Sequence, residues 1–220
     1  MSDSFQSIAY DRIRQDIICC RIAPRQKLSA KGLETTLGLG RTPVREALVR
    51  LGQQGLVHTV PQSGTYVSRI SMRSAESARF AREHIEKRIA TGAAAIIDDQ
   101  GKVCLEDIIK QQEAAVASHD DLAFFHLDNR FHEELFRLTE RHDIWMWLDA
   151  SNTDLERFRW LRTQVSDLDW NTILEQHHKM LDAICARNPE EAGFLTGVHL
   201  HLMTDEQEAV LAAFPDYFEQ

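Results

Sequence analysis

Hydrophobic positions in the first third of the chain recur at the spacing of three amphipathic helices. Isoleucines at helical spacing predict the first helix over residues 7–20. Ser29 is suited to be the N-cap of the second, at about 30–37, and a glycine-containing turn follows it. The third helix, over 42–53, carries an apolar stripe made of Val44, Ala47, Leu48 and Leu51.

Two short β-prone runs come next, at 56–60 and 65–67, and the segment between them has the Pro and Gly residues of a turn. This pattern predicts a hairpin. Three helices followed by a hairpin within about 70 residues form a winged helix-turn-helix, which binds DNA by placing its recognition helix in the major groove. The recognition helix in this chain is the one predicted over 42–53.

Helical patterns dominate the rest of the chain, and residues 71–74 fit a short linker. Six helices are expected here, near 74–98, 104–118, 120–139, 143–163, 169–187 and 189–212. The predicted fold is therefore mostly α, with a winged helix-turn-helix domain at 1–70 and an all-helical six-helix domain at 75–220.

Composition and charge agree with two domains of different function. The 220 residues are 43% hydrophobic and carry a net charge of −9, which is compatible with packed cores. Residues 1–70 have a net charge of +5, whereas residues 71–220 have −14. A basic segment joined to an acidic one is typical of a nucleic-acid-binding module fused to another domain, although chance clustering of surface charge is an alternative.

Neither the N-terminus nor the cysteines indicate export or membrane insertion. No stretch approaches the roughly 20 apolar residues of a membrane span, and the first residues lack the apolar core of a signal peptide. The four cysteines form no CxxC pair. We expect a soluble cytoplasmic protein with reduced thiols.

The most specific motif lies at the start of the predicted recognition helix. The run Arg41-Thr42-Pro43-Val44-Arg45-Glu46-Ala47-Leu48, with Gly64-Thr65-Tyr66-Val67 in the wing, resembles the GntR family of bacterial transcription regulators over about 8–69. The helical segment resembles the effector domain of the FadR-type branch, called FCD, and its six-helix form looks like the VanR subgroup. The resemblance implies a homodimeric, ligand-responsive regulator of a pseudo-palindromic DNA operator, with repression as the usual action.

The resemblance also implies which residues contact DNA. Arg41 and Arg45 match the arginines that contact bases and phosphates, and an arginine can address guanine O6 and N7 together. Thr42 suits a phosphate or base-edge contact, and Lys31 matches a residue that contacts the DNA backbone. Gly64 lies at the wing tip, where a missing side chain lets the backbone approach the minor groove.

Two positions depart from the family pattern, and the arginines have an alternative interpretation. Pro24-Arg25 replaces the usual Pro-Gly before the second helix, and Gly40 replaces a small hydroxyl residue, which removes one potential phosphate contact. Arg41 and Arg45 could instead belong to an exposed, salt-bridged helix face that includes Glu46.

A candidate metal site lies among the histidines of the helical domain. Asp128 and His132 are four residues apart and share a helix face, while His177 and His199 each lie on an apolar stripe of another helix. Buried polar groups need partners, and a divalent transition metal (Zn²⁺, Ni²⁺, Fe²⁺ or Mn²⁺) would satisfy all four. The alternative is a set of core histidines with ordinary hydrogen bonds. In the resemblance, the four positions match the ligands of metal-binding FCD domains.

The resemblance further implies a small organic acid as effector, bound at open positions of the metal. Arg82 matches a cavity-facing position and could pair with the effector carboxylate, unless it forms an exposed ion pair with Glu86. Arg157, Arg159 and Arg162 are further candidates for this cavity, and the sequence does not choose among them.

Two other functions are compatible with these patterns. A metal-dependent enzyme could act on a small carboxylate and carry the DNA-binding head as an accessory, with Glu133 or Glu175 as its base. A helical interaction protein could keep the DNA function without metal or effector. The regulator interpretation is preferred because no carboxylate lies at an obvious catalytic spacing from the predicted metal ligands.

Overall fold

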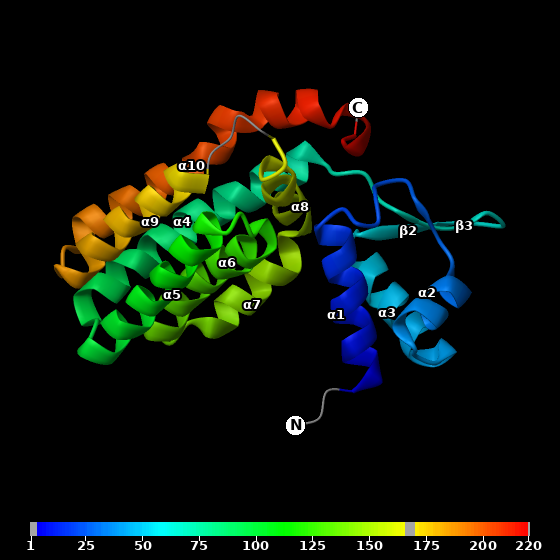
Figure 1. The fold of residues 1–220 in the computed structure, drawn as a ribbon, viewed down its shortest axis with the longest axis horizontal. Helices are drawn as coiled ribbons and strands as arrows, with labels where there is room; N and C mark the ends of the chain where they lie inside the picture. Colours follow the sequence, from blue (N-terminus) through cyan, green and yellow to red (C-terminus); the bar gives the residue numbers. More distant parts are fainter. Residues whose placement is uncertain (1–3, 166–169, 220) are drawn as a thin grey trace. The chain divides into compact units, whose positions relative to one another are not determined.

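The computed structural model describes residues 4–165 and 170–219, and Figure 1 shows its order of elements. The helices are α1 (Phe5–Ile18), α2 (Ala30–Leu37), α3 (Arg41–Gln53), α4 (Met72–Ile96), α5 (Asp99–Ala117), α6 (Asp121–Leu138), α7 (His142–Ser151), α8 (Thr153–Arg162), α9 (Trp170–Cys185), α10 (Pro189–Ala213) and a 3₁₀ turn, η1 (Pro215–Tyr217). The strands are β1 (Lys27–Leu28), β2 (Val57–Val60) and β3 (Gly64–Val67). The predicted fold class is confirmed.

The chain divides into two compact units. The first unit contains Met1–Ala75, Ala150–Leu161 and Val210–Gln220. The second unit contains Glu76–Asp149 and Arg162–Ala209. Four helices, α4, α7, α8 and α10, therefore contribute residues to both units.

Local capping explains where the helices of the winged helix-turn-helix begin and end. The Ser29 side chain accepts a hydrogen bond from the Gly32 backbone N–H and caps α2, as predicted. Gly38 ends the helix with a φ of 65°, a conformation that glycine adopts readily. Gly40 occupies the N-cap of α3 without any side-chain hydrogen bond, because it has no hydroxyl to offer.

The wing is a three-stranded antiparallel sheet with strand order β1-β3-β2. The predicted hairpin is present, with Val60 of β2 opposite Gly64 of β3. The sequence pattern missed β1, whose Lys27 lies opposite Tyr66, because two residues give no periodicity. Arg25, which replaces the family's glycine just before β1, has a φ of 68°. This left-handed conformation costs a residue other than glycine about 1–2 kcal/mol.

Segments from late in the chain complete the first unit. Arg157 of α8 is 1% exposed and donates a hydrogen bond from Nη1 to the carbonyl oxygen of Ser68 (2.7 Å). Arg14 of α1 pairs with Glu156 at 3.0 Å. Phe218, close to the C-terminus, forms a parallel β-bridge with Ile70. The winged helix-turn-helix thus forms one compact unit with most of α8 and with the C-terminal segment.

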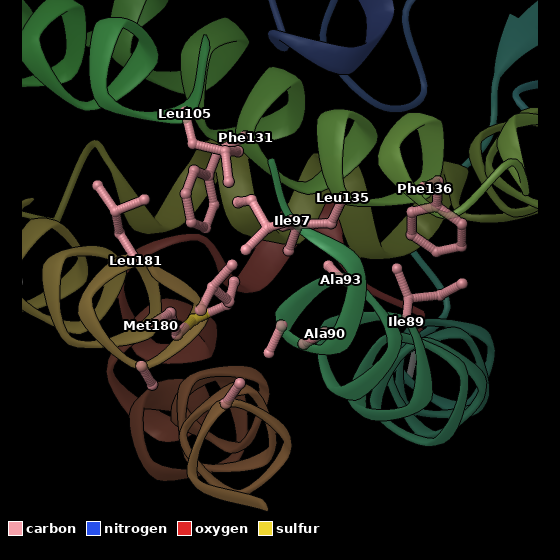
Figure 2. Close-up of a cluster of buried hydrophobic side chains, with 14 of the residues drawn as sticks. Ile89, Ala90, Ala93, Ile97, Leu105, Phe131, Leu135, Phe136, Met180 and Leu181 are labelled. Carbon is pink, nitrogen blue, oxygen red and sulfur yellow. The ribbon is translucent and has the colours of Figure 1, made fainter. Parts of the chain in front are cut away.

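The second unit has a core of aliphatic and aromatic side chains from its helices. Figure 2 shows small residues of α4 packed beside larger ones from α6 and α9. Ala90 and Ala93 are fully buried, and so are Phe131 and Met180. Alanines on α4 allow neighbouring helices to approach closely, and that approach places polar residues from α4, α6 and α9 near one another. The close packing of α4, α6 and α9 therefore positions the polar residues of the candidate site described below.

Several predicted helix limits were wrong, and local chemistry explains each difference. Helix α5 begins near Asp98 instead of 104, because the Asp98 side chain caps the helix by accepting from Gly101 N–H. The predicted helix 143–163 is interrupted at Asn152, a residue that favours helix starts over interiors. The predicted linker 71–74 runs into α4. Residue 169, predicted to open the fifth helix of that domain, lies outside the described residues.

No helix among residues 4–165 and 170–219 is both long enough and apolar enough to cross a membrane.

Candidate metal centre and nucleic-acid interface

The structure brings together the four residues predicted as metal ligands. Asp128 and His132 extend from α6, His177 from α9 and His199 from α10. One donor atom from each lies within 4.8 Å of all the others, and none of the four residues is more than 8% exposed. The Nε2 atoms of His132 and His199 are 3.2 Å apart, and His177 Nε2 lies 3.6 Å from Asp128 Oδ1.

Each histidine also has an oxygen close to its other ring nitrogen, which is an ion-pair contact for His132 and a hydrogen bond for His177 and His199. Nδ1 of His132 lies 2.7 Å from Glu86 Oε2, Nδ1 of His177 lies 3.0 Å from an amide oxygen, and Nδ1 of His199 lies 2.9 Å from another. The two amides belong to Gln112 of α5 and Gln176 of α9. An acceptor at Nδ1 favours the tautomer with its proton there, which directs the Nε2 lone pair toward the cluster.

The orientation of Gln112 strengthens this assignment for His177. The Gln112 Nε2 group donates to the backbone carbonyl of Leu127 at 3.1 Å, so its Oε1 is the end that faces the imidazole. An oxygen can only accept, and Nδ1 of His177 must therefore carry the proton.

The site fits a bound cation. Two imidazole lone pairs that converge at the distance between His132 and His199 repel each other unless a positive charge lies between them. Two ligand nitrogens bound at about 2.1 Å to one ion are about 3–4 Å apart, which includes the observed separation. Three neutral imidazoles and one carboxylate are a common donor set for Zn²⁺, Ni²⁺, Fe²⁺ and Mn²⁺. The residues present therefore suit a divalent transition metal.

Electrostatics keep one ligand, His199, in the neutral form that a metal requires. Burial, followed by the neighbouring His177 and His132, holds the pKa of His199 well below its usual value, so this imidazole is neutral near pH 7. Burial alone would raise the pKa of Glu86, but Arg82 and His132 outweigh it and lower that pKa to about 2. The site thus combines a neutral His199 imidazole with an ionised carboxylate at Glu86.

Arg82, the predicted effector-binding residue, lies next to this cluster. It is 1% exposed, and its Nε donates to Glu86 Oε1 at 2.5 Å. The ion pair with Glu86, the alternative interpretation from the sequence, is present, but it is buried rather than exposed.

The other candidate arginines differ in where their side chains are bound. Arg157 belongs to the first unit, where its Nη1 group donates a hydrogen bond to the carbonyl oxygen of Ser68. Arg162 belongs to the second unit and pairs with Glu206 of α10.

The predicted DNA-contacting residues lie on exposed parts of the first unit. Arg41, Thr42 and Arg45 are exposed in the first turns of α3. Among the described residues, neither of these arginines forms an ion pair, so the alternative of a salt bridge to Glu46 is absent there. Lys31 is exposed on α2.

The wing and α3 border a common groove. Its lining includes Arg45 and Val49 from α3 and Thr59 and Thr65 from the wing. Gly64 has a φ of 137°, and a Cβ there would lie 2.8 Å from a carbon of Lys27. The backbone of β3 thus needs a glycine at this position.

The sequence patterns did not identify the residues that surround the metal ligands. Gln112 and Gln176 were missed, and Glu86 was considered only as an ion-pair partner of Arg82. Gln112 is fully buried, which is unusual for a polar amide, but burial cannot be read directly from the sequence.

Comparison with known families covers both units. Residues 5–67 match the model for bacterial regulatory proteins of the gntR family. Residues 78–202 match the FCD domain model, which covers more than half of the chain. All four candidate metal ligands lie within this second match.

Comparison with individual proteins also finds transcriptional regulators. The chain is 29% identical to the HTH-type transcriptional repressor RspR of Escherichia coli K12, covering 96% of this chain and 92% of that protein. It is 28% identical to the HTH-type transcriptional repressor GlaR of the same strain, and the match covers 87% of this chain and 90% of that protein. Among solved structures, E. coli McbR/YncC superposes with a TM-score of 0.82 at 16% identity, covering 96% of this chain and 99% of that one, which shows the shared fold.

Proposed function

Because the chain belongs to the GntR family of transcription regulators and carries an FCD domain, we propose that it is a metal-containing repressor controlled by a small organic acid. The observation that carries this proposal is the buried convergence of Asp128, His132, His177 and His199 inside the FCD domain. Two repressors among its relatives support the direction of regulation. Membership of a regulator family disfavours the metal-dependent enzyme considered from the sequence.

DNA binding is assigned to a homodimer that acts in the cytoplasm on a pseudo-palindromic operator. Each recognition helix α3 enters a major groove, with half-sites about one helical turn or a related spacing apart. Arg41 and Arg45 read base edges, Thr42 and Lys31 bind the backbone, and Gly64 brings the wing close to the minor groove. The exposure of the α2 and α3 residues and the excess of basic residues over 1–70 support these roles.

The charges at the metal site suit a carboxylate effector. Arg82 and Glu86 cancel each other's charge, and Asp128 offsets half that of a divalent ion, so a metal-loaded site retains about one positive charge. An effector that binds there controls transcription only if its affinity differs between two arrangements of the DNA-binding domains. The terminal nitrogens of Arg82 are the groups assigned to the effector carboxylate.

The proposal also includes limits for the two functional domains and a subgroup within the family. Residues 1–70 and 75–220 are assigned to DNA binding and effector binding, with 71–74 between them. Assignment to the VanR-like subgroup is supported by the short helical domain, although α7 and α8 replace one predicted helix.

Two measurements on untagged protein test the proposal. Elemental analysis should find close to one transition-metal ion per chain, and selection from random DNA duplexes should enrich a sequence with two-fold symmetry. Failure to enrich any sequence would contradict the regulator assignment. A metal-free protein whose thermal stability does not respond to Zn²⁺, Ni²⁺, Mn²⁺ or Fe²⁺ would contradict the metal site.

Gly40 offers a test of the DNA-binding surface by gain of function. Gly40→Ser should add a cap to α3 and stabilise the first unit by a few tenths of a kcal/mol. The nearest atom to a Cβ at this position is 4.0 Å away, so the serine fits without strain. If its hydroxyl contacts a phosphate, operator affinity rises several-fold. Gly40→Ala, measured in parallel by fluorescence anisotropy, should give neither gain, and equal affinities for the two variants would contradict the contact.

A further inference from the structure

The three histidines of the candidate metal centre are held by chemically different partners. Gln112 and Gln176 present neutral amide oxygens to His177 and His199. Glu86 alone presents a carboxylate, at 2.7 Å from His132 Nδ1. Glu86 lies on α4, whereas the four proposed ligands lie on α6, α9 and α10.

We infer that Glu86 is a positioning residue for the metal centre, which acts through His132 and is itself held by Arg82. This inference rests on the metal site of the proposed function and adds a fourth helix, α4, to that site. Its basis is a continuous buried chain from the Arg82 guanidinium through both Glu86 oxygens to the His132 imidazole.

A carboxylate affects a metal-bound histidine in two ways. Its contact with Nδ1 restrains the ring orientation, and its negative charge increases the electron density at Nε2, which strengthens the bond to the metal. A neutral amide fixes the ring without supplying the charge. His132 is therefore the strongest donor of the three imidazoles.

Arg82 makes this arrangement possible in a fully buried position. Glu86 is 1% exposed, and a carboxylate without a partner would be strongly destabilised there. The Arg82 Nε group binds Oε1, which leaves Oε2 facing His132. The two oxygens of one carboxylate thus serve two different partners, and the ion pair sets the direction of the second contact.

The test compares metal binding by Glu86→Gln with a matched control on the same helix. Glu83 also pairs with an arginine four residues away, Arg79, at 2.7 Å, but both side chains are partly exposed and lie outside the metal cluster. Glu86→Gln should lower Zn²⁺ affinity about 10- to 100-fold, measured by competition with a chromophoric chelator. Glu83→Gln should leave the affinity unchanged.

A second readout separates positioning from a merely structural role. The visible absorption bands of Co²⁺-loaded protein should shift in Glu86→Gln, because the donor strength of His132 changes, and remain unshifted in Glu83→Gln. Since Glu86→Gln removes the carboxylate that pairs with Arg82, the double variant Arg82→Met with Glu86→Gln removes both charges. It should recover the thermal stability of the metal-free protein without recovering Zn²⁺ affinity.

The outcomes distinguish this inference from the proposed function. Wild-type affinity and Co²⁺ bands in Glu86→Gln would overturn the positioning role while leaving the metal site intact. Recovery of Zn²⁺ affinity in the double variant would also overturn it, because the loss in the single variant would then come from destabilised packing. A wild-type chain that binds neither Zn²⁺ nor Co²⁺ would overturn both proposals.

Discussion

Replacement of His177 by glutamine should abolish high-affinity metal binding and the thermal stabilisation that the metal provides. His177 is completely buried, and its imidazole lies 5.4 Å from the ring of His132 and 4.7 Å from that of His199. A metal present at about 1,000 times its Kd stabilises the folded state by about 4 kcal/mol. The variant should lose most of that increment, which denaturant unfolding with and without Zn²⁺ measures.

His178 provides a matched control for this prediction. It is the next residue in the chain, but its side chain is 42% exposed and lies near Glu113 on the surface. His178→Gln should therefore bind metal like the wild type. If both variants retained the stabilisation by Zn²⁺, the ion would bind elsewhere and the site assigned to Asp128, His132, His177 and His199 would be incorrect.

The sequence predicted the fold well where periodicity extends over several turns, and poorly where one residue decides the outcome. The apolar stripes on α1 and α3, together with the two β-prone runs and the turn between them, were sufficient to predict a winged helix-turn-helix. The sequence predicted no helix between residues 98 and 104, although this segment contains the Asp98 cap and the first turn of α5. Aspartate and glycine are frequent in both loops and caps, and only the hydrogen bond to Gly101 separates the two cases.

The metal ligands were predictable from the sequence, but their supporting residues were not. His177 and His199 stand out because each interrupts an apolar stripe on its own helix. Glu86 and Gln112 support histidines on other helices, so their roles depend on how α4 and α5 pack against them. Arg157 shows the same limit, since an arginine in a helix gives no indication of which distant backbone carbonyl it binds.

Replacement of Arg41 or Arg45 by alanine should weaken operator binding and relax its sequence preference. Both side chains are exposed near the start of α3, and neither pairs with an acidic residue among the described residues. A bidentate contact to guanine contributes about 1–3 kcal/mol of discrimination, so each substitution should reduce operator affinity about 5- to 150-fold. Fluorescence anisotropy with the selected operator and with single-base variants of it measures both effects.

Lys31→Ala distinguishes base reading from simple charge attraction. Lys31 lies on α2, and its removal should weaken binding to all sequences similarly and reduce the slope of log affinity against log salt by about one. Arg41→Ala and Arg45→Ala should instead change the ranking of operator variants at a fixed salt concentration. If the arginine variants behaved like Lys31→Ala, with a shallower salt slope and an unchanged base preference, α3 would contact only the DNA backbone, and sequence would have to be read by another part of the first unit.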